Sequence, residues 1–297
     1  MNKPIILYEN MRTVVYVPFY MAIERGDWAA MDIDVTVELS ASTSETAQGL
    51  IDGRVDVAWG GPMRVMLHHD RDRDCPLVCF AQVVARDPSI IVGREENDQF
   101  QFANLVGKRV GVVSEVPTPW MTLQDDLGRT GIDLGDINWV KNQTMTENAE
   151  ALDQGALDAV QIFEPYADDL VQRGVGNIWH RCAVRGDSCW TSFYTTEAFV
   201  QAQPDICRAL VRGIERALAA LHSDDPDNIA ETVREYFPEL EIEDLSRMIQ
   251  GYRNSHLWAL TTELPVAAFT RLKAAMLSGG LISFDAPYDR LVTDVMS

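Results

Sequence analysis

The feature that most constrains the fold of this chain is an internal repeat. Segments 44–58 and 146–160 carry the same residue types at a constant offset of 102, in the pairs Glu45/Glu147, Ala47/Ala149, Leu50/Leu152, Gly53/Gly155 and Asp56/Asp158. Each copy predicts a short helix, a glycine that ends it in the left-handed conformation, and a strand. The correspondence extends upstream, where a strand at 5–8 and a helix at 18–30 match a strand at 109–113 and a helix at 119–130. We therefore expect a duplicated chain with two similar lobes.

Further strands are expected at 35–39, 55–59, 77–84 and 90–92. Strands that alternate with helices predict parallel α/β sheets. Ligands of such sheets bind beyond the carboxyl ends of the strands, and pockets favour the interface between domains. The fold class expected is α/β, with two duplicated Rossmann-like lobes around a central cleft.

The last third of the chain changes to a helical pattern. Apolar residues at helical spacing predict helices at 204–221, 226–236, 242–252 and 265–277. We expect this tail to pack on the first lobe. The first lobe would then comprise residues 1–85 and 190–297, and the second lobe residues 86–189.

Charge and composition exclude several classes of function. The chain has 25 Lys+Arg against 45 Asp+Glu, a net charge of −20, which argues against nucleic acid or an anionic membrane surface as the main partner. No apolar run approaches the roughly 20 residues of a membrane span, so we expect a protein that is not membrane-embedded. No export leader is visible at the N-terminus, which is typical of a cytoplasmic chain or of a mature form.

Cysteine usage predicts neither a disulfide framework nor a metal site. The five cysteines are irregularly spaced and no C-x-x-C occurs. A bridge between Cys182 and Cys189 remains open. We expect no cofactor and no bound metal.

Four motifs carry a resemblance to a known family. They are Tyr16–Trp28, Ala47–Ala58, Leu105–Val112, and the closing Leu277–Ile282 with Pro287–Tyr288. In this order and spacing they resemble the NMT1/THI5-like group of substrate-binding proteins, which serve ABC importers of pyrimidine thiamine precursors, sulfonates and nitrate. The resemblance implies a type II periplasmic-binding-protein fold that closes on a small solute, and a periplasmic location.

The resemblance places the first lobe's ligand-binding residues in three loops. Hydroxyl, amide and backbone groups there suit a polar solute, and the paired glycines allow close approach of the backbone. Ser42 or Thr43 could instead simply cap the helix that follows. Tyr8, Tyr16, Phe19 and Trp59 could form an aromatic wall for a planar ring, although Phe19 is the better candidate for the core. The ligand-binding residues expected in this lobe are Tyr8, Asn10, Tyr16, Ser42, Thr43, Trp59, Gly60 and Gly61.

In the second lobe the candidates are Glu115, Thr118, Trp120 and Glu164. Glu164 could accept hydrogen bonds from an aminopyrimidine, or could serve only as a carboxylate at a helix start. Arg86, at the first crossing between lobes, could pair with an anionic ligand or with Asp87. The expected cleft loops also hold Glu9 and otherwise little positive charge, which favours a neutral or cationic heteroaromatic solute over a simple anion.

The sequence therefore predicts a binding protein that takes a small, planar, pyrimidine-like nitrogenous solute. An ABC permease is the expected partner, and a monomer the expected state. No catalytic residues are expected, because no Cys or His falls in the cleft loops. Two alternatives stay open: an enzyme on the same scaffold, of desulfinase, decarboxylase or pyrimidine-synthesis type, and a cytoplasmic ligand sensor.

Overall fold

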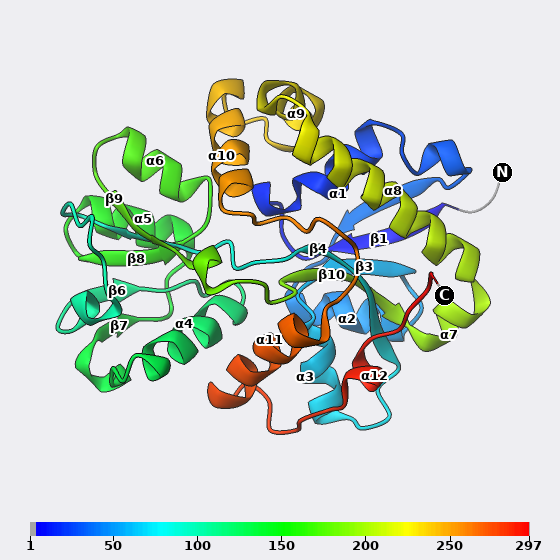
Figure 1. Ribbon diagram of the computed structural model, residues 1–297, viewed down its shortest axis with the longest axis horizontal. Coiled ribbons are helices and arrows are strands. Elements are labelled where there is room, and N and C mark those ends of the chain that lie inside the picture. Colours follow the sequence, from blue (N-terminus) through cyan, green and yellow to red (C-terminus); the bar gives the residue numbers. More distant parts are fainter. Residues whose placement is uncertain (1–3, 297) are drawn as a thin grey trace. The chain divides into compact units, whose positions relative to one another are not determined.

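The chain divides into two compact units, each built on its own five-stranded sheet (Figure 1). The structure is a computed structural model that describes residues 4–296, apart from the side chains of Thr43 and Ser44. Unit 1 comprises the chain up to residue 86, residues 187–273, and the chain from residue 282 onward. Unit 2 comprises residues 87–186 and 274–281.

The sheet of unit 1 has the strand order β2-β1-β3-β10-β4. Helices α1, α8 and α9 cover one face of this sheet, and α2 and α3 cover the other (Figure 1). The strands are β1 (Ile5–Glu9), β2 (Val35–Leu39), β3 (Val57–Gly60), β4 (Leu77–Val84) and β10 (Thr191–Thr196). The helices are α1 (Val17–Glu24), α2 (Thr43–Ile51), α3 (Met63–Arg71), α7 (Glu197–Ala202), α8 (Pro204–Ser223), α9 (Pro226–Val233), α10 (Ile242–Asn254), α12 (Tyr288–Leu291) and the first part of α11 (Val266–Ser278).

The sheet of unit 2 has the equivalent order β7-β6-β8-β5-β9. Its strands are β5 (Ile90–Gly93), β6 (Arg109–Gly111), β7 (Asn138–Val140), β8 (Ala159–Ile162) and β9 (Asn177–Arg181). Its helices are α4 (Thr118–Arg129), α5 (Met145–Asp153) and α6 (Tyr166–Gln172).

The predicted duplication is confirmed. Helix α5 begins and ends 102 residues after α2, and β8 begins and ends 102 residues after β3. Both copies use their glycine in the same way, since Gly53 and Gly155 have φ angles of 68° and 74°. In both copies the following aspartate accepts a backbone hydrogen bond from the neighbouring strand, at 2.8 Å from Ile6 N to Asp56 and at 2.8 Å from Arg109 N to Asp158.

The expectation of parallel sheets needs one correction in each unit. Strand β10 pairs antiparallel with β3 and β4, and β5 pairs antiparallel with β8 and β9. These are the strands that the chain forms directly after it passes from one unit to the other. Because β4 leaves unit 1 at the edge where the parallel strands end, a strand that re-enters there runs in the opposite direction.

Helix α8 shows why the C-terminal tail folds onto unit 1. Its stripe of Leu210, Ile214 and Leu218 is fully buried, as an amphipathic helix requires. Trp28 donates from Nε1 to the Leu210 carbonyl at 3.0 Å. The indole ring of Trp28 packs directly against Gly213, and a Cβ at this position would overlap the ring. The predicted helix at 204–221 is thus confirmed and extends to Ser223.

One part of the tail was assigned wrongly. Residues 274–281, the end of α11 and the turn after it, group with unit 2 and not with the first lobe. Ser278 Oγ lies 3.4 Å from Asp125 Oδ1 on α4, and Gly279 is where Met121 of α4 packs closely. The absence of a side chain at Gly279 permits this contact. Helical periodicity does not reveal the contact, because it does not show which unit the end of a helix packs against.

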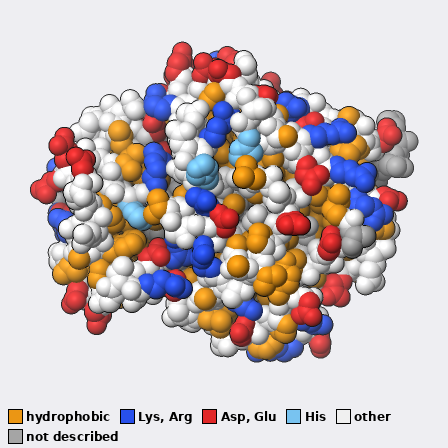
Figure 2. Space-filling model, viewed as in Figure 1, with side chains coloured by type: hydrophobic (Ala, Val, Ile, Leu, Met, Phe, Trp, Pro, Cys, Tyr) orange, Lys and Arg blue, Asp and Glu red, His pale blue; other side chains and the backbone are white. Residues whose placement is uncertain are grey.

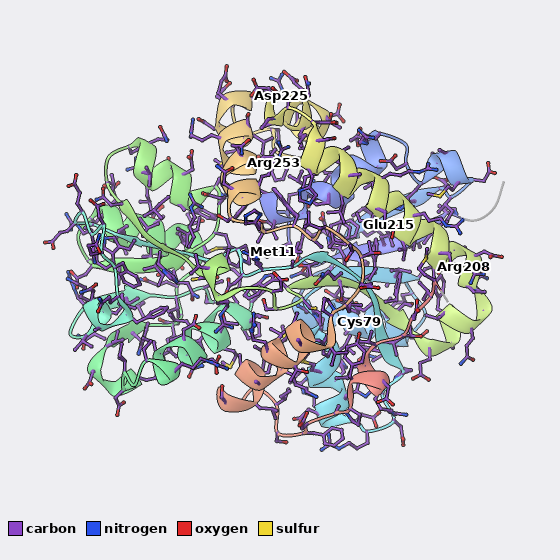
Figure 3. The ribbon with its side chains drawn as sticks, viewed as in Figure 1. Met11, Cys79, Arg208, Glu215, Asp225 and Arg253 are labelled. Atoms are coloured by element: carbon purple, nitrogen blue, oxygen red, sulfur yellow. The ribbon has the colours of Figure 1, made fainter. Side chains whose placement is uncertain are left out.

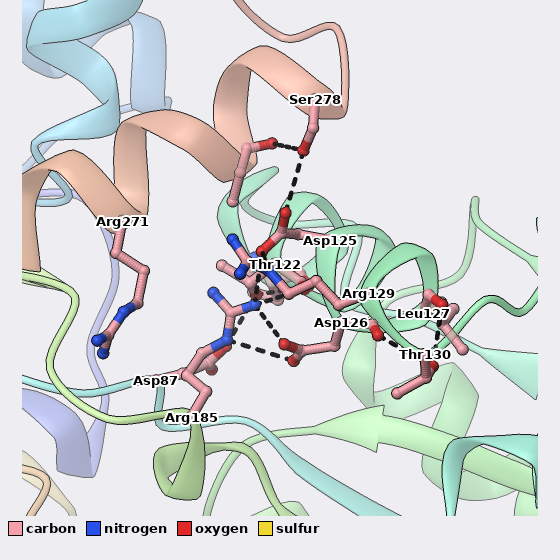
Figure 4. A network of polar contacts seen from close by, with 12 residues as sticks. Asp87, Thr122, Asp125, Asp126, Leu127, Arg129, Thr130, Arg185, Arg271 and Ser278 are labelled. Atoms are coloured by element: carbon pink, nitrogen blue, oxygen red, sulfur yellow. Dashed lines mark hydrogen bonds and ion pairs between the residues drawn. The ribbon is translucent and has the colours of Figure 1, made fainter.

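Unit 2 holds a buried polar network around Arg185 (Figure 4). The guanidinium donates to Asp126 Oδ1 at 2.6 Å and to the Thr122 carbonyl at 3.0 Å. Thr122 Oγ1 in turn donates to Asp87 at 2.8 Å. Burial raises the pKa of Asp87 above its ordinary value. Asp87 and Arg185, near the two ends of the main segment of unit 2, are therefore anchored on α4.

The cysteines form no disulfide among the described residues. All five thiols are free and buried, so the bridge left open between Cys182 and Cys189 is not formed. Within residues 4–296, no helix combines the length and the apolar character that crossing a bilayer requires.

Candidate ligand-binding site

The candidate site of unit 1 lies where its strands expose their carboxyl ends. Strands β1 and β3 end at Glu9 and Gly60, and β10 begins beside Gly60 because Ser192 pairs with it. The loops after the parallel strands and the start of β10 thus meet at one edge of the sheet, which is where α/β proteins bind ligands.

Four buried polar residues, the half-buried Asn10 and the backbone of Gly60 gather at this edge, and we call them the edge cluster: Asn10, Tyr16, Gly60, Arg64, Thr191 and Tyr194. Tyr16 donates from its hydroxyl to Asn10 Oδ1 at 2.9 Å. A Cβ placed on Gly60 would lie 3.5 Å from both Asn10 Oδ1 and the Tyr194 hydroxyl, so these two groups flank the glycine. Arg64, only 3% exposed, is electrostatically coupled to both tyrosines.

The edge cluster contains hydroxyl groups that the protein itself does not satisfy. Tyr194 OH and Thr191 Oγ1 are buried, and neither makes a hydrogen bond of good geometry among the described residues, although the side chains of Thr46 and Tyr16 lie near them. The neighbouring Ser192 Oγ on β10 is in the same state. Burial raises the pKa of Tyr194 to about 12, and it also raises the pKa of Tyr16. Both phenols are therefore neutral at ordinary pH and can donate a hydrogen bond.

Arg64 is the residue that most changes the electrostatics expected from the sequence. It lies in the first turn of α3, directly after the loop that carries Gly60 and Gly61. Arg64 was not predicted because it lies in a helix, whereas the charges expected at this edge were those of the loops. The signal was an arginine at the third position after a Gly-Gly pair. The expected lack of positive charge at this edge is wrong.

Glu9 does not supply the negative charge expected of it. The carboxylate is fully buried, 2.6 Å from Arg12 Nη2, and it accepts a hydrogen bond from Tyr20 OH at 2.7 Å. The pKa of Glu9 is raised, chiefly because burial disfavours its charged form. Arg12 also lies over the ring of Tyr236, at 5.0 Å from the centroid. Glu9 is thus part of an internal network.

Of the residues expected in the first lobe, the structure brings Asn10, Tyr16 and Gly60 together, with Gly61 next to them. Trp59 is fully buried and stacks on Phe19 at 4.4 Å between centroids, so these two residues of the expected aromatic wall pack in the core. Tyr8 lies apart from the cluster, against Gly49 of α2. Ser42 accepts a hydrogen bond from Glu45 N at 3.2 Å as the cap of α2. The side chain of Thr43 lies outside the described residues.

In unit 2 the two expected carboxylates, Glu115 and Glu164, accept hydrogen bonds at helix starts. Glu115 accepts a hydrogen bond from Met145 N at 2.8 Å, at the start of α5. Glu164 is 4% exposed and accepts from Asp168 N at 2.8 Å, within the first turn of α6. Trp120 packs edge to face on Trp139 at 4.8 Å, with Lys141 Nζ 4.3 Å from its ring. Thr118 is buried at the start of α4.

The sequence analysis missed Gln161 in this unit. Gln161 is fully buried in β8 and donates from Nε2 to the Pro119 carbonyl at 2.9 Å, while its Oε1 has no partner within the described part of the chain. A glutamine inside an otherwise apolar strand was the available signal. Arg86 pairs with Asp187 at 2.9 Å, and not with Asp87. Asp87 is instead bound to Thr122 and to Ser89 N.

Comparison with known proteins places these observations in a family. The family model described as "NMT1/THI5 like" matches residues 13–229. A protein of Bacillus subtilis (strain 168) that is named as a binding protein, YtlA, is 23% identical over 286 residues, which cover 96% of this chain and 86% of the relative.

Solved structures share the fold at low sequence identity. The periplasmic aliphatic sulphonate binding protein SsuA from Escherichia coli superposes with a TM-score of 0.79 at 12% identity, covering 98% of this chain and 97% of its own. The alkanesulfonate-binding protein SsuA from Xanthomonas axonopodis pv. citri, bound to MOPS, gives 0.75 at 14% identity and covers 98% of both chains. The desulfurization enzyme DszB gives 0.70 at 14% identity, covering 98% and 97%. The family match spans well over half of the sequence, and the chain belongs to the NMT1/THI5-like family.

Proposed function

We propose that this protein is a solute-binding protein of the ABC-importer type, and that the edge cluster of unit 1 holds the solute. The observation that carries the proposal is the set of unsatisfied hydroxyls on Thr191, Ser192 and Tyr194. A buried polar group without a partner costs roughly 1–3 kcal/mol, so several together at one sheet edge indicate that a ligand completes them. Family membership supports the same interpretation.

The chemistry of the cluster favours a solute that carries a negative group beside its polar atoms. Arg64 places a buried positive charge against Tyr16 and Tyr194. Guanidinium groups are the preferred readers of planar or tetrahedral oxyanions, and phenol hydroxyls donate to the same oxygens. The SsuA relatives are named for binding sulfonates, which have this chemistry. A small sulfonate or carboxylate is therefore the first solute to test.

The pyrimidine-like solute expected from the sequence remains a prediction and forms the second arm of the test. Its support is the amide of Asn10, which offers both donor and acceptor atoms to a nitrogenous ring. The stacking surface expected from Trp59 does not support it, since that ring is packed against Phe19. Tyr16 is the one residue of the expected aromatic wall that belongs to the edge cluster.

An enzyme on the same scaffold is the alternative function, because the DszB enzyme shares this fold. Turnover needs a nucleophile or an acid–base pair against the ligand. The edge cluster offers neutral phenols and an arginine, which suit binding. Glu115 and Glu164 could move protons, but each already accepts a backbone hydrogen bond. We propose binding without turnover.

Isothermal titration calorimetry with ethanesulfonate, MOPS, acetate and cytosine tests the proposal. We expect saturable binding of at least one compound, with one site per chain, and recovery of that compound unchanged from the mixture. Consumption of the compound would support the enzyme alternative. Binding of none, or binding that survives Tyr194→Phe unchanged, would contradict the proposal. An ABC permease partner, a periplasmic location and a monomeric state are further predictions of the same function.

A further inference from the structure

Unit 1 contains a second hollow, whose lining shares no residue with the edge cluster. It lies between the C-terminal ends of α8 and α10 and segment 257–262, which runs along the outer edge of β4. Figure 1 shows this segment leaving α10 and crossing in front of β4. The hollow has a volume of about 820 Å³, within the range of small-molecule pockets. We call it the α10 pocket and define it by Gln82, Arg86, His222, Arg253, His256 and Trp258.

The charge of the α10 pocket is opposite to that of the protein. The chain carries a net charge of −20, yet this lining holds two arginines and two of the five histidines, with Asp187 as its one carboxylate among the described residues. Asp187 is already paired with Arg86 at 2.9 Å. Figure 2 shows histidine side chains beside basic ones on this face of the molecule. A locally basic hollow in a strongly acidic protein attracts anions.

Two of the basic groups are held in place by the backbone. His222 Nε2 lies 3.0 Å from the Ala259 carbonyl, which orients its ring. Arg253, labelled at the end of α10 in Figure 3, donates from Nη2 to the carbonyls of Leu221 and Asp224. Its Nε is buried and has no hydrogen-bond partner in the described chain, and burial lowers its pKa. Asp224 and Asp225 lie near enough to favour the charged form of Arg253, although neither forms an ion pair with it among the described residues.

One further observation points to a ligand. Gln82 is 4% exposed, and its Oε1 has no hydrogen-bond partner within residues 4–296. An occupant of the pocket that carries a hydrogen-bond donor would satisfy this oxygen. His256 follows the end of α10 with a φ of 53°, the left-handed conformation that commonly closes a helix, and Leu257 N donates to the Tyr252 carbonyl there at 3.1 Å.

We propose that the α10 pocket is a second binding site, for a small organic oxyanion that also carries an O–H or N–H donor. The oxyanion pairs with Arg253, His222 and His256, and the donor satisfies Gln82 Oε1. Carboxylates and phosphates share this chemistry, so the experiment has an arm for each. The proposal does not depend on the function proposed for the edge cluster.

Nuclear magnetic resonance titration of the histidine ring protons, with the intact chain, is the direct test. The probes are citrate, glycerol 3-phosphate and neutral glycerol. We expect saturable shifts of the His222 and His256 signals with citrate, glycerol 3-phosphate or both, and none with glycerol. His222→Gln and His256→Gly assign the signals, and His68→Gln serves as the matched histidine control because His68 does not line the pocket.

The variant Gln82→Met separates binding from a structural role. It removes the unsatisfied oxygen while keeping the volume, so we expect about tenfold weaker binding of the oxyanion with an unfolding temperature that is unchanged or higher. It should leave solute binding at the edge cluster intact, whereas Tyr194→Phe should weaken the solute and spare the oxyanion. No saturable shift with either anion, equal binding of glycerol, or full oxyanion affinity in Gln82→Met would overturn the proposal.

Discussion

Two buried tyrosines of unit 1, Tyr20 and Tyr194, differ in whether the hydroxyl group has a hydrogen-bond partner. This difference separates a structural role from a binding role. Tyr20 donates its hydroxyl to Glu9 at 2.7 Å, while the Tyr194 hydroxyl has no such partner among the described residues. Removing a satisfied hydroxyl leaves its partner unpaired, and removing an unsatisfied one removes a cost. We therefore expect Tyr20→Phe to destabilise the protein by roughly 1–3 kcal/mol and Tyr194→Phe to leave stability unchanged or raise it.

Urea unfolding followed by circular dichroism measures both variants under the same conditions. A loss of stability in Tyr194→Phe as large as in Tyr20→Phe would show that the Tyr194 hydroxyl has a structural partner. The edge cluster would then lose its main support.

A methyl group at position 60 tests the space inside the edge cluster. The added Cβ of Gly60→Ala would meet Asn10 and Tyr194 at 3.5 Å, an ordinary contact distance, so we expect less than about 1 kcal/mol change in stability. The methyl would occupy space between two solute-binding groups, and solute affinity should fall about tenfold or more in calorimetry. Gly53→Ala, with its positive φ of 68°, is the contrasting variant and should lose stability without losing affinity.

At this scale the sequence identified part of the candidate site. Asn10, Tyr16 and Gly60 could be predicted because they follow strands, and strand ends are visible in the apolar pattern. Arg64, Thr191 and Tyr194 could not, since Arg64 is inside a helix and the other two come from a strand formed 100 or more residues later. Trp59 was assigned to the ligand because an aromatic residue before two glycines has the same appearance whether it faces a solute or Phe19.

At the scale of elements, the duplication gives pairs of equivalent groups with different surroundings. Asp158 accepts hydrogen bonds from Arg109 N and from its guanidinium, and this pairing lowers the Asp158 pKa from 3.8 to about 2. A carboxylate with a depressed pKa in the folded state stabilises the protein above its ordinary pKa, and this contribution is lost as the pH falls. The loss should occur between pH 3.8 and about 2.

We expect Asp158→Asn to be less stable than the wild type at neutral pH and to show a smaller loss of stability between pH 3.8 and 2. Thermal unfolding across that range measures the difference. Asp56→Asn is the matched control, because Asp56 accepts the equivalent backbone hydrogen bond from Ile6 and shows no ion pair among the described residues. Equal acid dependence in the wild type and in Asp158→Asn would contradict the assignment.

Elements were the part of the fold that the sequence predicted best. Strands β2 and β4 have the predicted bounds, and α8 to α11 begin within one residue of the expected positions. The first predicted helix, 18–30, was too long because Gly26 adopts a φ of 68° and ends it. Strand β10 was not predicted, because it lies where the sequence pattern was taken to become helical. The direction of β5 could not be predicted, since it depends on how the chain passes between units and not on local periodicity.

At the scale of the whole molecule, the net charge of −20 determines how we expect stability to respond to salt. Repulsion among like charges disfavours a compact state, and salt screens it over about 8 Å at physiological ionic strength. We expect the unfolding temperature to rise as sodium chloride is added from low ionic strength. Sucrose at matched osmolality is the control for general exclusion effects. An unfolding temperature that falls with added salt would mean that favourable ion pairs outweigh the repulsion.

The central claim is that the edge cluster of unit 1 binds a small polar solute. The most direct measurement is the calorimetric affinity of wild type, Tyr194→Phe and Tyr20→Phe for the compound that binds the wild type most tightly. The account predicts that Tyr194→Phe loses about tenfold in affinity or more, while Tyr20→Phe, despite its lower stability, keeps the wild-type affinity. The opposite pattern, or equal affinities in all three proteins, would contradict it.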